Sequence, residues 1–301
     1  MRRILWGSLI LAAGLAMLFG LGACDPEDFT AARSEATRVE TATFAVTGVP
    51  VVSVESSNGA VTVTGVPGQT DVRVIVTIRS RAGSQEAADK RAAAVTLHLE
   101  QQGGRILLAY RGSEQVDDVR RYTGVAFDVT GPTMLEAGVG TSNGAISVTS
   151  AQGRISLETS NGEVTLTDIV GQVSATTSNG RITAERCQGV LRLDTSNGAV
   201  SMTDVSAALD ATTSNGAIHF SGSLIGDANA LETSNGAIVV AVPAAASVEF
   251  TARTSGASIS SSLPLVGDTQ GKEWLATLNP PATSRVTLRT SNGAITIGSR
   301  P

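Results

Sequence analysis

The sequence predicts an all-β protein, a single-chain β-solenoid with two strands in each coil of about 18 residues, resembling a parallel β-helix or β-roll. One short helix is expected in its N-terminal part. The tetrapeptide Thr-Ser-Asn-Gly recurs every 18 residues, and then once more after 20, starting at Thr141, Thr159, Thr177, Thr195, Thr213 and Thr233. A second set of glycines, Gly153, Gly171 and Gly189, lies midway between these tetrapeptides. After each glycine apolar and polar residues alternate, which places one face of a strand inside and the other in water.

Asn-Gly is also a strong hairpin signal, so an antiparallel meander is the alternative. A single-layer meander would leave its apolar face uncovered, whereas a two-strand coil presses the apolar faces together. In a solenoid, residues 18 apart lie one strand spacing apart, about 4.8 Å. Asp168, Arg186 and Asp204 then form a stack of alternating charge, and Arg192 meets Asp210. These pairings favour the solenoid.

The asparagines of the turns are expected to stack as an amide ladder, in which each side chain hydrogen-bonds the next. The glycine after each asparagine is expected to supply the positive φ of the corner. An unpaired polar group in such a turn costs about 1–3 kcal/mol, which favours a ladder without gaps. The expected members are Asn143, Asn161, Asn179, Asn197, Asn215 and Asn235.

The N-terminus has the pattern of a bacterial lipoprotein signal peptide, expected over residues 1–23. Arg2 and Arg3 precede an uncharged run that ends in Leu21-Gly22-Ala23-Cys24, which resembles a lipobox with Cys24 as the lipid attachment site. A retained membrane helix and ordinary secretion are the alternatives, since the run is long enough to span a bilayer. Asp25 resembles an inner-membrane retention signal and favours that membrane, while the choice between a periplasmic and a surface face stays open.

The remaining chain divides into three expected parts. Residues 24–41 are polar and should form a tether. Residues 42–130 should be rich in strands, with an early copy of the turn at Ser56-Ser57-Asn58-Gly59 and a helix from Gln85 to about Ala94 capped by Ser84. Residues 131–301 should form the solenoid, with a bulge near Asn229 and an irregular loop over 263–283.

These features together resemble the bacterial "putative adhesin" family, catalogued as a domain of unknown function. The resemblance rests on the Thr-Ser-Asn-Gly-Ala-Ile copies, the strand-helix-hairpin region before them, and a last copy in Thr290-Ser291-Asn292-Gly293-Ala294-Ile295-Thr296-Ile297. It covers nearly all of the chain after the expected signal peptide. It implies a β-solenoid on the cell envelope and brings no catalytic residues with it.

The sequence offers little chemistry. Gly140-Thr141-Ser142-Asn143-Gly144 fits the G-x-S-x-G pattern of a nucleophile elbow, but it is the first copy of a repeated turn and has no histidine partner. His98 and His219 are expected at outward strand positions, and Cys187 in the core. Calcium-binding β-rolls have aspartate in their turns, which these turns lack. We therefore expect no catalytic residue, no cofactor and no metal.

Composition narrows the class of partner. The chain has 301 residues, of which 42% are hydrophobic and 3% aromatic, which suits thin β-layers of Val, Ile, Leu and Thr. The formal net charge is −5, or −7 without Arg2 and Arg3, and a basic patch is not evident in the sequence. This argues against nucleic acid as a partner.

We expect a lipid-anchored, membrane-attached interaction scaffold of the cell envelope, adhesin-like and without catalysis. The partner is an envelope glycan or protein, and the oligomeric state stays open. Trp274 is the expected partner contact, with capping of the solenoid's open end as its structural alternative. The other functions that remain are a polysaccharide lyase or hydrolase on a β-helix scaffold and a sensor of envelope stress.

Overall fold

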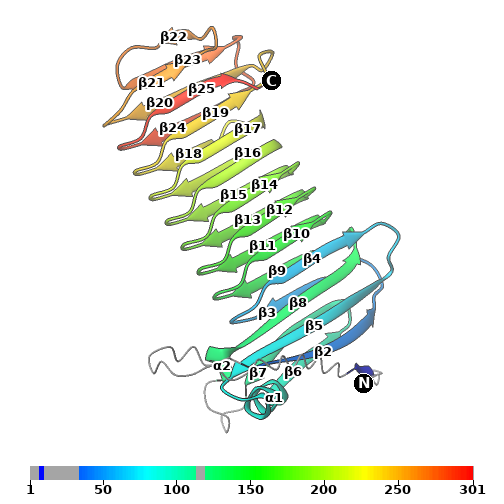
Figure 1. The fold of residues 1–301 in the computed structure, drawn as a ribbon. Coiled ribbons are helices and arrows are strands. Elements are labelled where there is room, and N and C mark those ends of the chain that lie inside the picture. The colour runs from blue at the N-terminus through cyan, green and yellow to red at the C-terminus, as the bar shows by residue number, and fades with distance from the viewer. Residues whose placement is uncertain (1–6, 10–33, 113–118, 301) are drawn as a thin grey trace, which may run out of the picture.

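The computed structural model describes residues 7–9, 34–112 and 119–300. These residues form 25 strands and two short helices, α1 (Gln85–Ala93) and α2 (Val119–Tyr122). The strands stack into a tower, with the helices at one end and the C-terminus at the other (Figure 1). The expectation of an all-β solenoid with a short helix in its N-terminal part is confirmed.

The tower has two walls, and each is a continuous sheet. The first wall contains, in spatial order, β6 (Val95–Gln102), β7 (Arg105–Gly112), β3 (Val51–Glu55), β9 (Glu136–Thr141), β11 (Gln152–Thr159), β13 (Val170–Thr177), β15 (Gln188–Thr195), the second half of β16 (Val200–Thr213), β18 (Asn229–Thr233), β24 (Ser284–Thr290), β20 (Val248–Thr254), β23 (Glu273–Leu278) and β22 (Val266–Asp268). The second wall contains β1 (Gly7–Leu9), β2 (Ser34–Ala45), β5 (Asp71–Ala82), β8 (Thr123–Pro132), β4 (Val61–Val66), β10 (Ile146–Thr149), β12 (Val164–Thr167), β14 (Ile182–Glu185), the first half of β16, β17 (Ile218–Leu224), β19 (Ile238–Val242), β25 (Ile295–Ser299) and β21 (Ile259–Ser261).

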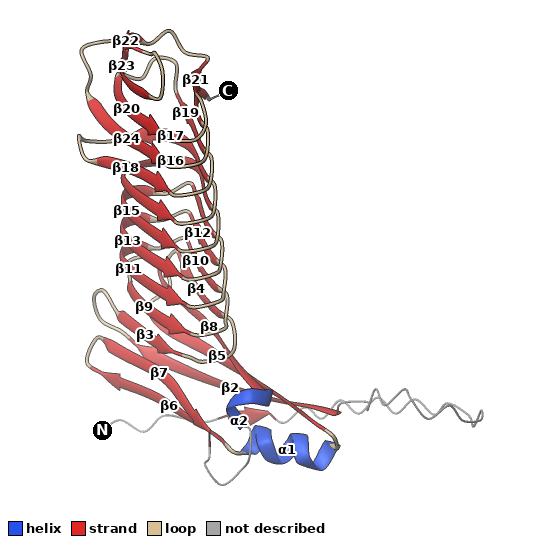
Figure 2. Ribbon diagram, turned by 90° about the vertical axis from the view of Figure 1, so that its left-hand side faces the viewer, coloured by secondary structure: helices blue, strands red, loops and turns tan. Residues whose placement is uncertain are grey.

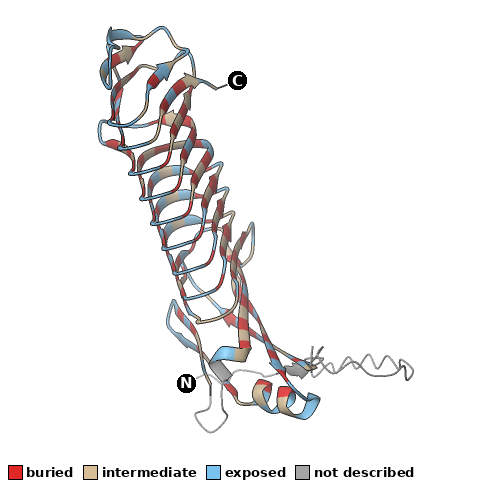
Figure 3. Ribbon diagram, turned by 60° about the vertical axis from the view of Figure 1, so that its left-hand side comes forward, coloured by how far each residue is buried: buried red, intermediate tan, exposed pale blue. Residues whose placement is uncertain are grey.

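The strands of the middle coils run parallel, with partners 18 residues apart, such as Ile155 beside Val173. This rules out the antiparallel meander there. Every second side chain points between the walls, so buried and exposed residues alternate along each strand (Figure 3). The buried side chains are mostly Val, Ile, Leu and Ala. Each buried larger aliphatic side chain contributes about 1.5–3 kcal/mol to stability. Because such side chains recur in every coil, this stabilisation is spread along the whole tower.

The corners explain why the sequence repeats glycine, and the reason differs from the expected one. The glycines of the Thr-Ser-Asn-Gly turns do not have left-handed φ angles. They are needed because the backbone of the coil below is too close, so that a Cβ added at Gly180 would lie 1.7 Å from the carbonyl oxygen of Gly162. Positive φ angles occur instead at the other corner, both at non-glycine residues such as Asp168 and Arg186, with φ of 56° and 51°, and at glycines such as Gly171, with φ of 141°.

The solenoid starts earlier than expected. β3 and β4 form a first coil directly beneath β9 and β10, although paired residues such as Val61 and Ile146 are 85 positions apart in the sequence. The segment between them forms an N-terminal cap of antiparallel strands, with α1 and α2 at its tip (Figure 2). The expected boundary at residues 130 and 131 is therefore wrong, because residues 71–132 form an insertion between two coils rather than a region that precedes them.

The tether is also shorter than expected, because β2 begins at Ser34 and pairs with β5 along its whole length. The buried positions of this strand include the small residues Ala36 and Ala42, so the alternation of apolar and polar residues is weak and did not indicate a strand there. α1 matches its expectation: the Ser84 side chain accepts a hydrogen bond from the Ala87 amide at 3.3 Å. The Arg38 guanidinium donates to the Ala92 carbonyl at 2.8 Å and so fixes the other end of the helix to β2.

At the C-terminal end the last coil is inserted between two earlier ones. β24 lies between β18 and β20, and β25 between β19 and β21. The expected irregular loop over 263–283 instead contains β22 and β23, because the outer edge of β20 is free to pair with β23. Asn229 points inward; its side chain accepts from the Leu209 amide at 2.9 Å and donates to the Arg285 carbonyl at 2.8 Å.

Candidate interaction site

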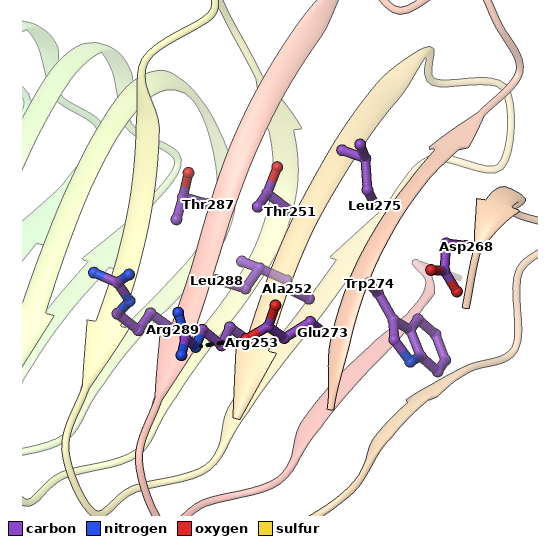
Figure 4. A pocket seen from close by; sticks show the side chains of 10 residues that line it. All are labelled: Thr251, Ala252, Arg253, Asp268, Glu273, Trp274, Leu275, Thr287, Leu288 and Arg289. Atoms are coloured by element: carbon purple, nitrogen blue, oxygen red, sulfur yellow. Dashed lines mark ion pairs between the residues drawn. The ribbon is translucent and has the colours of Figure 1, made fainter. Parts of the chain in front are cut away.

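The outer face of the first wall carries two rows of side chains at its C-terminal end. The rows cross β24, β20 and β23, which the register holds side by side. One row contains Thr287, Thr251 and Leu275, and the other contains Arg289, Arg253 and Glu273 (Figure 4). Alternate residues of a strand share a face, so the two rows lie on one surface.

A hollow of about 470 Å³ lies at these rows. It is shallow, and Trp274 and Asp268 lie at its side toward β22 (Figure 4). Leu275 and Val266 are 57% and 63% exposed, so apolar surface borders the hollow at the tip of the solenoid. We call this group of lining residues the C-terminal hollow.

Trp274 lies on the inward side of β23, two and four residues before the buried Ala276 and Leu278. Its ring packs partly against the core, and its Nε1 donates a hydrogen bond to the Gly271 carbonyl at 3.3 Å. The opposite wall ends at the short strand β21 nearby, which leaves the ring half-buried. This geometry supports the capping role, while its exposed part lines the hollow. That Trp274 contacts a partner stays a prediction.

The charges of the hollow are unevenly paired. Arg253 Nε and Glu273 Oε1 lie 3.0 Å apart in an exposed ion pair, which contributes at most about 1 kcal/mol to stability. Arg289 has no ion pair with any residue of the described part of the chain, although Glu232 is its neighbour in the register on β18. The hollow therefore presents one unpaired guanidinium beside threonine hydroxyls and apolar surface. This combination can hold a carboxylate or another anionic group.

The expected asparagine ladder is present in the structure and longer than the sequence indicated. Each Nδ2 donates to the Oδ1 of the coil before it at 2.7–2.8 Å, in a row that runs through Asn58, Asn143, Asn161, Asn179, Asn197, Asn215, Asn235 and Asn292. Asn58 joins the row because the first coil pairs directly with the coil of β9 and β10. Asn292 joins it because the last coil pairs with the coil of β18 and β19. All but the half-buried Asn58 are exposed, so the ladder joins the coils along one outer edge.

Sequence reasoning missed a second ladder inside the same turns. The threonine of each turn is buried, and Thr177 Oγ1 donates to the Gly162 carbonyl at 3.1 Å while accepting from the Gly180 amide at 3.1 Å. Both backbone groups would otherwise be unpaired in the core. The sequence does carry a signal for this ladder. Every Thr-Ser-Asn-Gly copy has threonine at its first position, where only the early copy at Ser56 has serine.

The charged stack at the other corner differs in part from expectation. Arg186 Nε lies 2.6 Å from Asp168 Oδ1, and Arg186 also pairs with Glu185. Its hydrogen bond holds the pKa of the Asp168 carboxyl below its usual range. Asp204 instead pairs with Arg300 at 2.8 Å, because the C-terminus runs back to this corner. Arg192 and Asp210 meet at 2.9 Å, as expected.

Among the described residues, His98 lines a groove of β3, β6 and β7 together with Glu55, Glu100 and Tyr110. His219 is exposed on β17, and His98 lies at the opposite end of the tower, on β6. Among the described residues, no three His, Cys, Asp or Glu side chains form a group that could hold a metal ion. Cys187 is buried, and burial raises the pKa of its thiol. Asp268 and Glu273 are the carboxylates of the C-terminal hollow.

Cys24 and Asp25 lie outside the described residues, so lipid attachment stays a prediction. Of the expected signal peptide the structure describes Gly7–Leu9, which pairs with β2 as strand β1. No helix within residues 7–9, 34–112 and 119–300 has the length and apolar character needed to cross a membrane.

The parallel two-walled coils, their amide ladder and their capped ends define a β-solenoid. Residues 120–298, more than half of the chain, match the family described as Toastrack DUF4097, and the chain belongs to this family. The match begins just before β8, so it includes part of the N-terminal cap. A search of curated proteins gave no match.

Solved structures similar to this chain include a "putative adhesin" from Bacteroides fragilis NCTC 9343, with 11% identity over 87% of this chain and 97% of that one, at a TM-score of 0.44. A "putative adhesin" from Parabacteroides distasonis ATCC 8503 has 9% identity over 86% and 96% of the two chains, at a TM-score of 0.35. A "putative cell adhesion protein" from Clostridium sporogenes ATCC 15579 has 9% identity over 89% and 100%, at a TM-score of 0.27.

Proposed function

We propose that this chain is a lipid-anchored, non-catalytic interaction protein of the bacterial cell envelope, and that it contacts an envelope glycan or protein through the C-terminal hollow. The observation that carries the proposal is the position of this hollow. It is lined by residues of β20, β22, β23 and β24 at one end of the tower, whereas β2, which begins at Ser34, lies at the other end (Figure 1). A scaffold anchored at Cys24 would hold the hollow away from its membrane.

The chemistry of the hollow favours binding. Arg289 offers a contact for an anionic group, Thr251 and Thr287 offer hydrogen bonds, and the partly exposed Trp274 offers an apolar surface within one shallow site. Tryptophan and arginine are enriched among residues that dominate binding energy. The site is open rather than cleft-like, and Glu273, one of its two carboxylates, is paired with Arg253. Most enzymes that hydrolyse glycosidic bonds use a pair of carboxyl groups that flank the bond.

The test of the contact surface uses residues 25–301, without lipid, and envelope fractions separated into glycan and protein. We expect binding that Arg289→Ala weakens about tenfold, with little change in melting temperature, because Arg289 is exposed and unpaired. Arg154→Ala on the outer face of β11 is the matched control and should bind like the unchanged chain. Equal binding by both variants would remove the C-terminal hollow as the contact surface.

Trp274→Ala separates the two roles of this residue. A partner contact predicts weaker binding with a small change in melting temperature, and a pure core cap predicts a large drop in melting temperature with unchanged binding by the folded fraction.

Catalysis is tested with Glu273→Gln and Asp268→Asn, since polysaccharide turnover abolished by either change would overturn the non-enzyme proposal. Lipid attachment is tested with Cys24→Ala, which should abolish incorporation of labelled palmitate and leave an uncleaved precursor.

A further inference from the structure

A second hollow, of about 460 Å³, lies at the opposite end of the tower and is lined by arginines. Arg79 and Arg81 point outward from β5, and Arg121 and Tyr122 come from α2. A basic patch is not evident in the sequence because these residues are dispersed along the chain. The antiparallel pairing of β5 with β8 brings them together, since Ser80 faces Thr123, which directly follows α2. We call this group the arginine hollow.

Within the described part of the chain, these arginines have few acidic partners, and Arg81 and Arg121 have contacts that position them. The guanidinium carbons of Arg91 and Arg121 lie 5.1 and 5.4 Å from the centre of the Tyr122 ring, within the range of a cation–π contact. Arg91 also donates to the Arg81 carbonyl at 2.7 Å. Among the described residues Arg79 and Arg121 have no ion pair. Arg81 has one, in which its Nε lies 3.0 Å from Oε2 of the exposed Glu35.

The register also places this hollow beside the start of β2. Glu35 faces Arg81, and Ser34 faces Ala82, so the chain leaves the cap at the edge of the arginine hollow. Ten residues separate Cys24 from Ser34, and an extended chain of that length spans at most about 35 Å. A chain anchored through Cys24 therefore keeps these arginines within reach of lipid headgroups.

We propose that the arginine hollow docks on the phosphate groups of anionic phospholipids in the membrane that holds the anchor. This rests on the proposed lipid anchoring for its location, but the contact itself needs no acyl chain. Arginine forks match phosphate oxygens in bidentate geometry. Basic residues near an anionic bilayer each strengthen attachment about fivefold at moderate ionic strength. Docking would fix the cap against the bilayer and orient the tower.

The experiment uses residues 25–301 without lipid and measures cosedimentation with phosphatidylcholine vesicles, either pure or mixed with phosphatidylglycerol. We expect binding to the mixed vesicles alone, and a loss of about 25-fold in the double variant Arg79→Gln and Arg121→Gln. The matched control changes Arg154 and Arg181 to Gln, which removes the same charge from exposed positions of the solenoid and should alter binding less than twofold.

Four outcomes would overturn the proposal. These are equal binding to both vesicle types, equal losses in the two double variants, displacement from vesicles by millimolar inorganic phosphate at constant ionic strength, and equally tight variant-sensitive binding to duplex DNA. The acidic residues Glu114, Asp117 and Asp118 precede α2 in the sequence, and neutralisation of the arginines by them would give the first outcome. Failure of palmitate labelling at Cys24 would refute the anchor and leave vesicle binding by the lipid-free chain to be judged separately.

Discussion

The middle coils and the two ends of this solenoid are built from the same turn but by different rules. From β9 to β18 each coil stacks on the one before it in sequence, so local repetition produces the structure. At the ends, coils that are neighbours in space are not neighbours in sequence. The residues of the N-terminal cap interrupt the sequence between the first two coils, which nevertheless pair directly with each other. The last coil in sequence lies in space beneath the coil that precedes it. The ends also carry both hollows that we propose as contact sites.

This difference shows how a repeat protein separates stability from function. In the middle, the glycine and the asparagine of each turn contact their counterparts in the neighbouring coils, and the buried threonine hydroxyl donates to the glycine carbonyl of the preceding coil. Replacing any of them affects at least one interface between coils. At the ends one of these contacts is missing or is made by a different residue, so side chains there can vary with less cost. Substitutions in a middle coil should therefore cost more than the same substitutions at an end or at a position that lacks the contact.

The largest effect is expected for Gly180→Ala. Its new Cβ would lie 1.7 Å from the Gly162 carbonyl oxygen, a backbone atom that cannot move without breaking the coil. We expect a loss of more than about 4 kcal/mol in the free energy of unfolding, or failure to fold, by urea denaturation followed with circular dichroism. Gly140→Ala, with no atom within 4 Å of its new Cβ, should lose less than about 1 kcal/mol. Similar losses in both would disprove the close-approach explanation.

A smaller effect is expected for the buried threonines. Thr177→Val leaves the Gly162 carbonyl and the Gly180 amide unpaired, which should cost about 2–4 kcal/mol. Thr254 lies in Thr254-Ser255-Gly256, a copy of the turn near the C-terminal end that lacks the asparagine. Its hydroxyl donates to the Gly293 carbonyl at 2.8 Å but is 3.5 Å from the Ala257 amide. Thr254→Val should cost about half as much. The comparison fails if the denaturant midpoints of the two variants coincide.

The asparagine ladder should contribute less, because its amides are exposed. Asn179→Ala removes a hydrogen bond to Asn161 and one from Asn197, and should cost about 1–2 kcal/mol. Asn292 is a member of the ladder and donates to Asn235, but the next turn has Gly256 in place of asparagine. Asn292→Ala should therefore cost about 0.5–1 kcal/mol. Equal losses, measured by thermal and denaturant unfolding, would show that stacking does not depend on paired neighbours.

The smallest effect concerns acid. Because Arg186 lowers the pKa of Asp168 in the folded chain, their pairing stabilises the fold above the ordinary aspartate pKa of 3.8 and is lost as the pH falls through the folded value. Arg186→Gln should slightly lower the free energy of unfolding at neutral pH, and the difference from the unchanged chain should vanish in stronger acid. A difference that persists below the folded pKa would assign the effect to the left-handed corner at residue 186 rather than to charge.

The sequence by itself determined the repeating part of the molecule. Period, alternation and turn residues predicted the parallel coils, their 18-residue register, the amide ladder and the capped helix α1, because each of these depends on residues close in sequence or one period apart. It also singled out Trp274, whose half-buried position the structure explains.

Tertiary structure decided the rest. The insertion of the cap, the placement of Asn58 and Asn292 in the ladder and the gathering of Arg79 and Arg121 all depend on which free strand edge accepts which strand. An edge offers the same backbone groups to any strand, so alternation of apolar residues cannot select the partner. That choice is made by the packing of side chains distant in sequence, and the two hollows exist because of it.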